Sequence, residues 1–394
     1  MSDKYQVVTT QSWIGRIGNS IKGLLFGFIM FLLAFPLLFW NEGRSVKDYK
    51  TLKEGAGAVI SVSVDKVDPA NAGKLIHMTG QATPVSVLSD PVFNVSAKAL
   101  KLKREVEMYQ WKENKKSKTQ NKLGGGTETV TTYQYDQQWS SQLINSSNFN
   151  KSAEYNNPST MPYQTKEYVA NDAALGAFVL TQSLLNKISD YKSLVVDNTQ
   201  ILPSGLGATA KYYGTGFYIG ETPNTPKIGD IRVTFQQVGP TVVSLIAGQV
   251  SNTFEPYRAR TGNTIELLQS GTHSAETMFQ TEQESNVLLT WLLRLGGFTL
   301  MFIGLIVFLK PLSVIADVLP ILGTIVGAGT ALISFLIAAL LSVITIAIAW
   351  VFYRPLLAII LIIIAGGLGY LVVTKLKAAK VVKLAQSENQ AVAS

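Results

Sequence analysis

The chain has 394 residues, no cysteine, two histidines and a formal net charge of +8 at pH 7. A chain without cysteine has no disulfide, thiolate metal site or cysteine nucleophile. Residues 41–287 are almost neutral, with 24 Lys/Arg against 23 Asp/Glu, so the excess positive charge flanks or interrupts the apolar segments. That distribution is typical of membrane flanks rather than of a basic nucleic-acid-binding face, and no nucleic-acid partner is expected.

Four apolar segments are long enough to cross a bilayer, which takes about 20 residues. They are residues 23–40, 288–309, 331–353 and 355–374. The turn Tyr353-Arg354-Pro355 is so short that the last two segments are predicted to form a tight hairpin. The first segment is predicted to be a retained anchor, because no small-residue cleavage site precedes Asn41.

The predicted fold class is a multi-pass α-helical membrane protein with a large β-rich (α+β) extracytoplasmic domain, residues 41–287, between the first and second spans. Lysines flank both ends of the chain, so an even number of spans with both termini cytoplasmic is expected. The remaining segments are an amphipathic cytoplasmic N-terminal segment (1–22, with a helix from Thr10), an apolar connecting segment (310–330, interfacial, re-entrant or spanning) and a basic cytoplasmic tail (375–394).

Alternating apolar residues predict that most of the central domain is strand, for example at Ile60, Val62 and Val64. Two long runs, 100–111 and 127–139, predict a hairpin with a lysine-rich tip that includes Lys115, Lys116, Lys118 and Lys122. Further strands are predicted at 231–235 and 242–247. One helix is predicted, capped by Asn171 and continuing through Leu175, Phe178, Gln182 and Leu185.

Short motifs distributed almost from end to end resemble the LUMA family of transmembrane proteins. They include Asn41-Glu42-Gly43-Arg44, Glu107-Met108-Tyr109-Gln110-Trp111, Gly229-Asp230-Ile231-Arg232-Val233, Trp291-Leu292-Leu293-Arg294 and Phe352-Tyr353-Arg354-Pro355. The resemblance implies a multi-pass protein with both termini on the cytoplasmic or nucleoplasmic side and a large domain on the other. In animals the family is associated with the inner nuclear membrane and with organising envelope proteins. The resemblance implies no catalytic residues.

Candidate structural or interface residues lie in and beside the apolar segments. Trp40 is expected at the depth of the membrane–water interface. The segment Asn41-Glu42-Gly43-Arg44 is either an ordinary interfacial flank of the first span or a motif that fixes the orientation of the domain relative to the bilayer. In the motif, Gly43 is expected to supply a backbone conformation closed to other residues. Ionisable residues inside a membrane are candidate functional sites. For Arg294 the favoured interpretation is snorkelling to the headgroups, with an ion pathway as the alternative.

Three further positions complete the candidates. Asp317 lies in the ambiguous segment 310–330, and Arg354 occupies the predicted hairpin turn, where it can anchor at the interface. Gly366 and Gly369 are predicted to allow close helix approach and so to serve association between spans.

The sequence therefore predicts a non-enzymatic membrane scaffold or membrane-organising protein that forms a homo-oligomer. The expected partners are the lipid bilayer and other membrane proteins, and no cofactor or metal is expected, because neither His77 nor His273 has a suitably spaced ligand. A transporter or channel subunit is the alternative, and a lipid-modifying enzyme is the third hypothesis. The cysteine-free domain favours a bacterial member of the family in the inner membrane, with the endoplasmic reticulum or inner nuclear membrane as the alternative.

Overall fold

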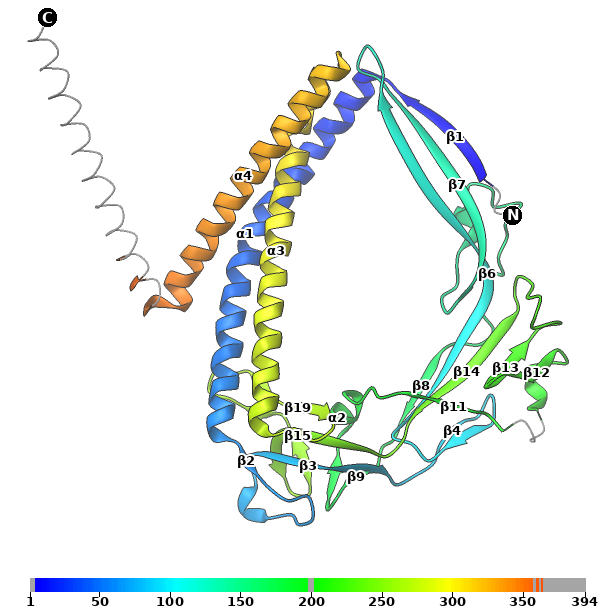
Figure 1. The fold of residues 1–394 in the computed structure, drawn as a ribbon, viewed down its shortest axis with the longest axis vertical. Coiled ribbons are helices and arrows are strands. Elements are labelled where there is room, and N and C mark those ends of the chain that lie inside the picture. Colours follow the sequence, from blue (N-terminus) through cyan, green and yellow to red (C-terminus); the bar gives the residue numbers. More distant parts are fainter. Residues whose placement is uncertain (1–3, 198–201, 357–358, 361–362, 364–394) are drawn as a thin grey trace, which may run out of the picture. The chain divides into compact units, whose positions relative to one another are not determined.

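The structure, a computed structural model, describes residues 4–197, 202–356, 359–360 and 363 (Figure 1). The chain divides into two compact units. The β-rich unit comprises Tyr49–Ser285 together with the N-terminal residues up to Trp13, and the helical unit comprises Ile14–Asp48 and the chain from Asn286 onward. Each unit is described by itself below.

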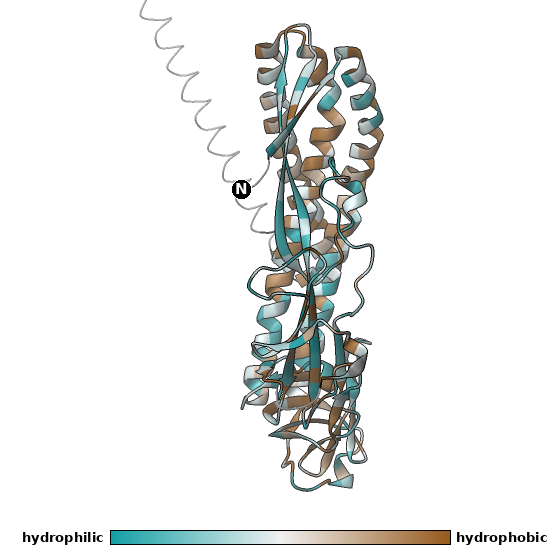
Figure 2. Cartoon of the chain, turned by 90° about the vertical axis from the view of Figure 1, so that its right-hand side faces the viewer, coloured by the Kyte–Doolittle hydropathy of each residue, from teal (hydrophilic) through white to brown (hydrophobic). Residues whose placement is uncertain are grey.

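Three helices within the described residues are long and apolar enough to cross a membrane. They are α1 (Trp13–Ala58), α3 (Ala275–Ala316) and α4 (Pro320–Tyr353). In Figure 2 hydrophobic (brown) residues recur along the helices. Large apolar side chains such as Leu25, Leu292 and Leu340 are exposed on them, as a lipid environment requires. The prediction of apolar helices with a large β-rich region between the first and the second is confirmed.

The rest of the described chain is mostly strand, with one further α-helix, α2 (Gln182–Asn186), and three single-turn 3₁₀ helices at Pro69–Asn71, Ser146–Asn148 and Ser204–Leu206. In chain order the strands are β1 (Lys4–Gln11), β2 (Ile60–Ser61), β3 (Leu75–Pro84), β4 (Leu88–Asp90), β5 (Val95–Ala97), β6 (Lys101–Asn121), β7 (Thr127–Ser140), β8 (Lys166–Val169), β9 (Ala173–Leu175), β10 (Phe178–Leu180), β11 (Lys192–Leu194), β12 (Ala210–Tyr213), β13 (Gly216–Ile219), β14 (Ile231–Val238), β15 (Thr241–Val250), β16 (Thr253–Glu255), β17 (Tyr257–Arg258), β18 (Thr264–Ile265) and β19 (Leu267–Ser270).

Two larger sheets organise the β-rich unit. One has eight strands in the order β1-β7-β6-β14-β13-β12, with β8 on β6 and β11 on β14. The other has seven strands in the order β10-β9-β3-β15-β16, with β2 on β3 and β19 on β15. Each buries its own apolar cluster, around Phe93, Val106 and Phe235 in the first sheet and around Met78, Phe178 and Leu245 in the second. The unit therefore has its own hydrophobic cores, built by alternating residues of long strands.

The predicted long hairpin is confirmed as β6 and β7, paired from Met108 opposite Ser140 to Asn121 opposite Thr127. The predicted location of its lysines is wrong in part. Lys115, Lys116 and Lys118 lie within β6, and only Lys122 lies in the turn. The strand continues past them because Thr and Ser pairs across the hairpin, such as Ser117 with Thr131, support an extended backbone.

The predicted helix after Asn171 is wrong. Residues 173–180 form the two short strands β9 and β10, and only Gln182–Asn186 is helical. Leu175 and Phe178 have helical spacing, but Gly176 lies between them at φ +59°, where it makes a turn that reverses the chain. A Cβ at this glycine would collide with the backbone of Val64, so the turn needs glycine for space as well as for φ.

The N-terminal segment also differs from its prediction. Residues 4–11, which include Thr10, form strand β1 and pair with β7, and helix α1 begins at Trp13. While β1 is paired, it lies on the same side of a membrane as β7. The expected topology places residues 1–22 and residues 41–287 on opposite sides, so this pairing and that topology exclude each other.

The predicted connecting segment 310–330 is helical at both ends. Helix α3 continues to Ala316, a short break follows, and α4 begins at Pro320 and continues without interruption to Tyr353. Most of the predicted span 355–374, with Gly366 and Gly369, and the whole tail 375–394 lie outside the described residues.

Candidate functional site

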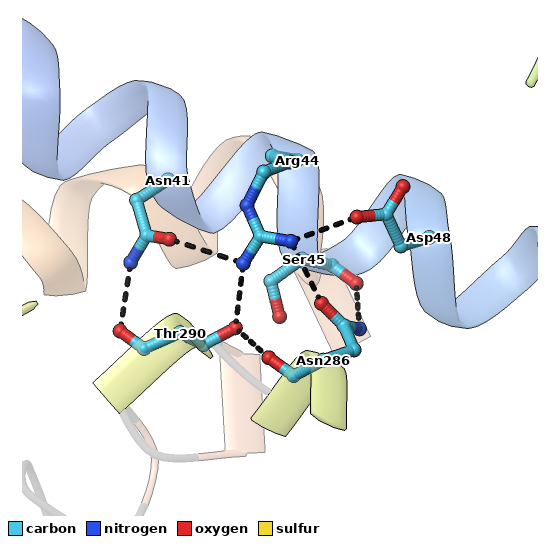
Figure 3. A network of polar contacts seen from close by, with 6 residues as sticks. All are labelled: Asn41, Arg44, Ser45, Asp48, Asn286 and Thr290. Carbon is cyan, nitrogen blue, oxygen red and sulfur yellow. Dashed lines mark hydrogen bonds and ion pairs between the residues drawn. The ribbon is translucent and has the colours of Figure 1, made fainter. Parts of the chain in front are cut away.

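Polar residues gather on one face of α1 just beyond its most apolar stretch. Asn41 precedes Arg44 and Ser45 by three and four residues, and Asp48 follows them by four and three, a spacing that places residues on one face of a helix. On α3, Asn286 and Thr290 are related in the same way. These six residues, Asn41, Arg44, Ser45, Asp48, Asn286 and Thr290, form the Arg44 cluster shown in Figure 3.

The guanidinium group of Arg44 is the centre of this cluster. Its Nη1 donates to Asp48 Oδ2 at 2.8 Å and to Asn286 Oδ1 at 3.0 Å. Its Nη2 donates to Thr290 Oγ1 at 3.1 Å and to Asn41 Oδ1 at 3.3 Å. Because the four acceptors come from both helices, one planar side chain fixes the register of α1 against α3.

The amide side chains complete the link between the helices. Asn41 Nδ2 donates to the backbone carbonyl of Thr290 at 3.0 Å, and Asn286 Nδ2 donates to the backbone carbonyl of Ser45 at 3.0 Å (Figure 3). Each helix therefore contributes an asparagine that binds the backbone of the other helix. Buried amides satisfied in this way specify one arrangement of the two helices.

A second group of side chains links α1, α3 and α4. Glu42 on α1 and Arg294 on α3 form the Glu42 pair, and Trp350 on α4 binds to it. Arg294 donates through Nε to Glu42 Oε1 at 2.6 Å and through Nη2 to Oε2 at 2.9 Å, a bidentate geometry. The indole Nε1 of Trp350 donates to the same Oε2 at 2.8 Å. The side chain of Glu42 is fully buried, so a single carboxylate connects all three apolar helices.

Aromatic rings surround the cation of the Glu42 pair. The Arg294 guanidinium lies 4.7 Å from the ring centre of Trp291 and 5.8 Å from that of Trp350. The predicted snorkelling of Arg294 is therefore wrong, because its guanidinium is paired with Glu42 and only 14% of its side chain is exposed. A fixed, neutralised pair avoids the several kcal/mol that an uncompensated buried charge costs, about 3–5 kcal/mol when one partner is removed.

Gly43 lies between these polar residues and has a helical backbone inside α1, so the prediction of a special backbone conformation is wrong. The structure gives another reason for glycine. A Cβ at this position would lie 2.6 Å from Cζ of the Tyr353 ring, which packs against α1 where α4 ends. The same ring is 5.3 Å from that of Phe39, centre to centre. Gly43 thus gives Tyr353 the space to close the end of α4 onto α1.

A separate ion pair lies at the other end of the helical unit. Arg16, the fourth residue of α1, donates to Asp317, in the break between α3 and α4, and both side chains are largely buried. A Cβ on Gly323 would collide with the Asp317 carboxylate, so Gly323 leaves space for this pair. The break that looked ambiguous in the sequence is therefore fixed by a charge from the start of α1.

The structure brings together four of the predicted candidates, Asn41, Glu42, Arg44 and Arg294, and leaves others apart. Trp40 is 55% exposed and takes no part in the polar contacts above. Arg354 caps the end of α4, where its backbone N–H donates to the carbonyl of Trp350.

Six participants were not predicted: Ser45, Asp48, Asn286, Thr290, Trp350 and Arg16. A tryptophan in an apolar span indicates membrane anchoring, so nothing local marked Trp350 as a hydrogen-bond donor. Asn286 and Thr290 carry a usable signal, because two polar residues four apart share one face at the start of an apolar helix.

The described part of the chain contains no group of three or more His, Asp or Glu side chains that could hold a metal ion. The β-rich unit has a cavity of about 520 Å³, lined by neutral side chains only: Ser141, Leu143, Ser159, Thr160, Met161, Gln164 and Thr165. Hydrolytic chemistry needs a positioned base or nucleophile. The Arg44 cluster and the Glu42 pair, in contrast, place charged groups in fixed contacts suited to holding helices together.

Comparison with known proteins adds the following. The family model described as "Transmembrane protein 43" matches residues 108–355. Transmembrane protein 43 from Homo sapiens is 34% identical over 369 residues, which cover 91% of this chain and 91% of the human protein. The Mus musculus protein is 35% identical and covers 88% of each chain, and the Drosophila melanogaster homolog is 28% identical and covers 89% of this chain and 94% of its own. No solved structure matches the chain significantly.

Proposed function

Because the chain belongs to the transmembrane protein 43 family, we propose that it is a non-enzymatic integral membrane scaffold that self-associates and organises other membrane proteins. The observation that carries the proposal is the Glu42 pair. A carboxylate that accepts three hydrogen bonds from two other helices is held in place, whereas a transport site must exchange its partners for a solute.

Close backbone contact between α1 and α3 supports the same function. Gly27 and Gly304 lie opposite each other, and a Cβ on Gly304 would be 2.6 Å from the backbone nitrogen of Phe31 and 2.8 Å from the carbonyl oxygen of Gly27. Such small-residue contacts give tightly packed helices with no space for a polar path between them. A rigid three-helix anchor is what a scaffold needs to present the same surfaces to its neighbours.

The proposed self-association uses the outer faces of the helices. Large apolar side chains remain exposed along α4, including Leu332, Leu336, Leu340 and Val343. These faces meet either lipid or another copy, and Gly366 and Gly369, outside the described residues, are the positions at which we propose close contact between copies. The proposed partners are thus a second copy, other membrane proteins and the bilayer, with no cofactor.

Cross-linking in native membranes, together with flux measurements in reconstituted vesicles, tests the proposal. We expect a ladder of cross-linked species from the full chain, weakened by Gly366→Leu or Gly369→Leu, and no release of small ions from vesicles that contain the purified protein. A strictly monomeric protein whose ion conductance is abolished by Arg294→Leu would instead establish the transporter or channel alternative.

We also propose which membrane holds the protein and on which side of it the termini lie. The cysteine-free composition supports a bacterial inner membrane. Single cysteines at Ser2, Ser117 and Ser394 can be labelled with an impermeant maleimide in intact cells. Cytoplasmic termini predict labelling at position 117 alone, whereas β1 paired as in the structure predicts that positions 2 and 117 react from the same side.

A further inference from the structure

The outer end of the β6–β7 hairpin takes no part in the cores of the β-rich unit. Strand β14 pairs with β6 only as far as Met108, and from Lys112 to Asn121 the two strands β6 and β7 pair with each other (Figure 1). We call residues 115–127 the hairpin end. Within the described residues, none of them belongs to a buried apolar cluster of the unit. Core packing therefore does not account for this length of ribbon.

The hairpin end is basic, although the domain that carries it is not. It holds four lysines, Lys115, Lys116, Lys118 and Lys122, and no Asp or Glu. The rest of residues 41–287 has 20 Lys/Arg against 23 Asp/Glu, a slight excess of negative charge. All four lysines are exposed. Positive charge in this domain is thus concentrated at one end of one hairpin, where it attracts negatively charged partners.

The chain neutralises these lysines only in part. Lys122 forms an ion pair with Glu128 at 3.1 Å, but 53% of the lysine side chain stays exposed. Lys116 and Lys118 are two residues apart and therefore lie on one face of the strand. Within the described residues neither forms an ion pair, and the residues opposite them on β7 are uncharged. Two neighbouring ammonium groups repel each other, so a surface that supplies negative charge to this face lowers their free energy.

An apolar side chain lies at the tip of this charged ribbon. Leu123 is 83% exposed, more than any other large apolar side chain in the described part of the chain, including those on the apolar helices. The turn fixes its position, because the N–H of Lys122 donates to the carbonyl of Gly126 at 2.8 Å. Gly124 and Gly125 supply the positive φ angles of the turn, +85° and +78°. A leucine held in water in this way lowers its free energy by entering an apolar phase.

The combination of lysines and leucine narrows the choice of partner. Lysines on an edge strand also prevent pairing with other strands, but that role leaves the exposed Leu123 without an explanation. A nucleic acid would neutralise the lysines and offers no apolar phase to the leucine. A bilayer with anionic headgroups supplies both, since its phosphates bind ammonium groups and its acyl boundary accepts an apolar side chain.

We propose that the hairpin end docks on an anionic lipid surface, with Leu123 at the acyl boundary and Lys116, Lys118 and Lys122 at the headgroups. The proposal goes beyond the scaffold function. It depends only on β6, β7 and their turn, so it is independent of the pairing of β1 and of the number of copies that associate. Because exposed charges are screened by salt, the docking is expected to weaken as the ionic strength rises.

A fluorophore sensitive to polarity, attached to Leu123→Cys in the otherwise cysteine-free full chain, tests the proposal. One arm uses nanodiscs made of equimolar phosphatidylcholine and phosphatidylglycerol, which test docking on the bilayer that holds the helices. The other uses phosphatidylcholine nanodiscs to which vesicles of the equimolar mixture are added, which test docking on a second bilayer. We expect blue-shifted emission, quenched by lipids with a spin label in the acyl chain, in at least one arm. The same fluorophore on Val85→Cys, at a site 60% exposed between β3 and β4, should not respond.

Charge reversal tests the role of the lysines. Each basic residue near an anionic surface contributes about a factor of five to binding, so Lys116→Glu with Lys118→Glu should lower the ratio of docked to free protein at least about tenfold. The matched control is Lys66→Glu with Lys98→Glu, which changes the net charge equally at two exposed lysines outside the hairpin. Circular dichroism and thermal unfolding establish that both variants remain folded.

Three results would overturn the proposal. They are the absence of a response in both arms, a response that is equal in pure phosphatidylcholine and insensitive to the charge reversal, and a response to a short DNA duplex but not to lipid. The cross-linking and flux measurements on the scaffold function do not involve the hairpin end. Failure of one proposal is therefore distinguishable from failure of the other.

Discussion

Each unit of the molecule contains a buried carboxylate paired with an arginine, and the two pairs are built in different ways. In the β-rich unit, Arg104 Nη1 donates to Asp90 Oδ1 at 2.9 Å and Oδ2 at 2.7 Å, and the backbone N–H groups of Val92 and Phe93 donate to the same carboxylate at 3.0 and 3.2 Å. In the helical unit, the hydrogen bonds that Glu42 accepts within the described residues all come from side chains of other helices, Arg294 and Trp350.

The two carboxylates have different partners because a turn and a helix differ in how many backbone N–H groups are free to donate. A turn after β4 leaves amide groups free, so Asp90 finds two donors within three residues of itself. Inside a helix every N–H is already bonded to a carbonyl of the same helix, so Glu42 can be neutralised only by residues brought from elsewhere in the chain. A buried charge in an apolar helix therefore depends on the tertiary structure more than one in a sheet protein does.

The largest expected effect is at Glu42. Glu42→Ala leaves Arg294 buried without its carboxylate, and we expect the helical unit to lose about 3–5 kcal/mol of stability. Unfolding of the detergent-solubilised protein by heat or denaturant measures the loss. Glu276→Ala, an exposed glutamate in the first turn of α3, is the control and should change stability by less than about 1 kcal/mol. Equal effects at the two positions would contradict a stabilising role for the pair.

Replacing both members of the Glu42 pair sharpens this test. The combination Glu42→Leu with Arg294→Met removes both charges and fills similar volumes, so it should recover much of the loss caused by either change alone. A double variant as unstable as the sum of the single variants would show that the two residues act independently.

A somewhat smaller effect is expected for Asp90 in the β-rich unit. Asp90→Ala should cost about 3 kcal/mol, because Arg104 keeps the carbonyl of Gln164 as an acceptor at 3.0 Å and its contact with the Phe93 ring at 5.2 Å. Chemical unfolding followed by tryptophan fluorescence measures this loss. The control Glu154→Ala removes an exposed ion pair, which is worth about 0–1 kcal/mol.

The contact between Gly27 and Gly304 gives a third, smaller effect on stability. Its control is expected to change stability in the opposite direction or not at all. Gly304→Ala forces a methyl group against the backbone of α1 and should cost about 1–3 kcal/mol. Gly296→Ala lies on the same helix with no atom within 4 Å of its Cβ, so it should be neutral or stabilise the helix by up to about 1 kcal/mol. Thermal stability in detergent distinguishes these outcomes.

The smallest effect expected is a dependence on alkaline pH in the β-rich unit. Burial, and then the hydrogen bond that its hydroxyl donates to Glu113, raise the pKa of Tyr135 from 10.0 to about 12. The unfolded chain ionises first, so stability should fall as the pH rises from about 10 to about 12. Tyr135→Phe should reduce this slope, measured by unfolding at several pH values. A slope unchanged by the substitution would show that Tyr135 does not cause it.

Local patterns in the sequence were sufficient for the elements that local physics controls. Apolar length predicted the helices, and alternation or a composition rich in strand-forming residues predicted β6, β7, β14 and β15, because each property belongs to a continuous segment. Local spacing was misleading at 171–185, where Leu175 and Phe178 fit a helix but Gly176 reverses the chain between two short strands.

The candidate site shows where the sequence alone was insufficient. Glu42, Arg44 and Arg294 stand out in the sequence because charges are rare in apolar segments, but their partners lie up to 308 residues away along the chain. The backbone N–H and C=O groups of a helix bond to each other within that helix. The polar contacts of its side chains therefore depend on which helix packs beside it. Composition and periodicity by themselves thus determined that the chain has apolar helices and a β-rich region. Only the tertiary structure decided that Trp350 binds to the Glu42 pair, that Arg16 meets Asp317, and that β1 pairs with β7.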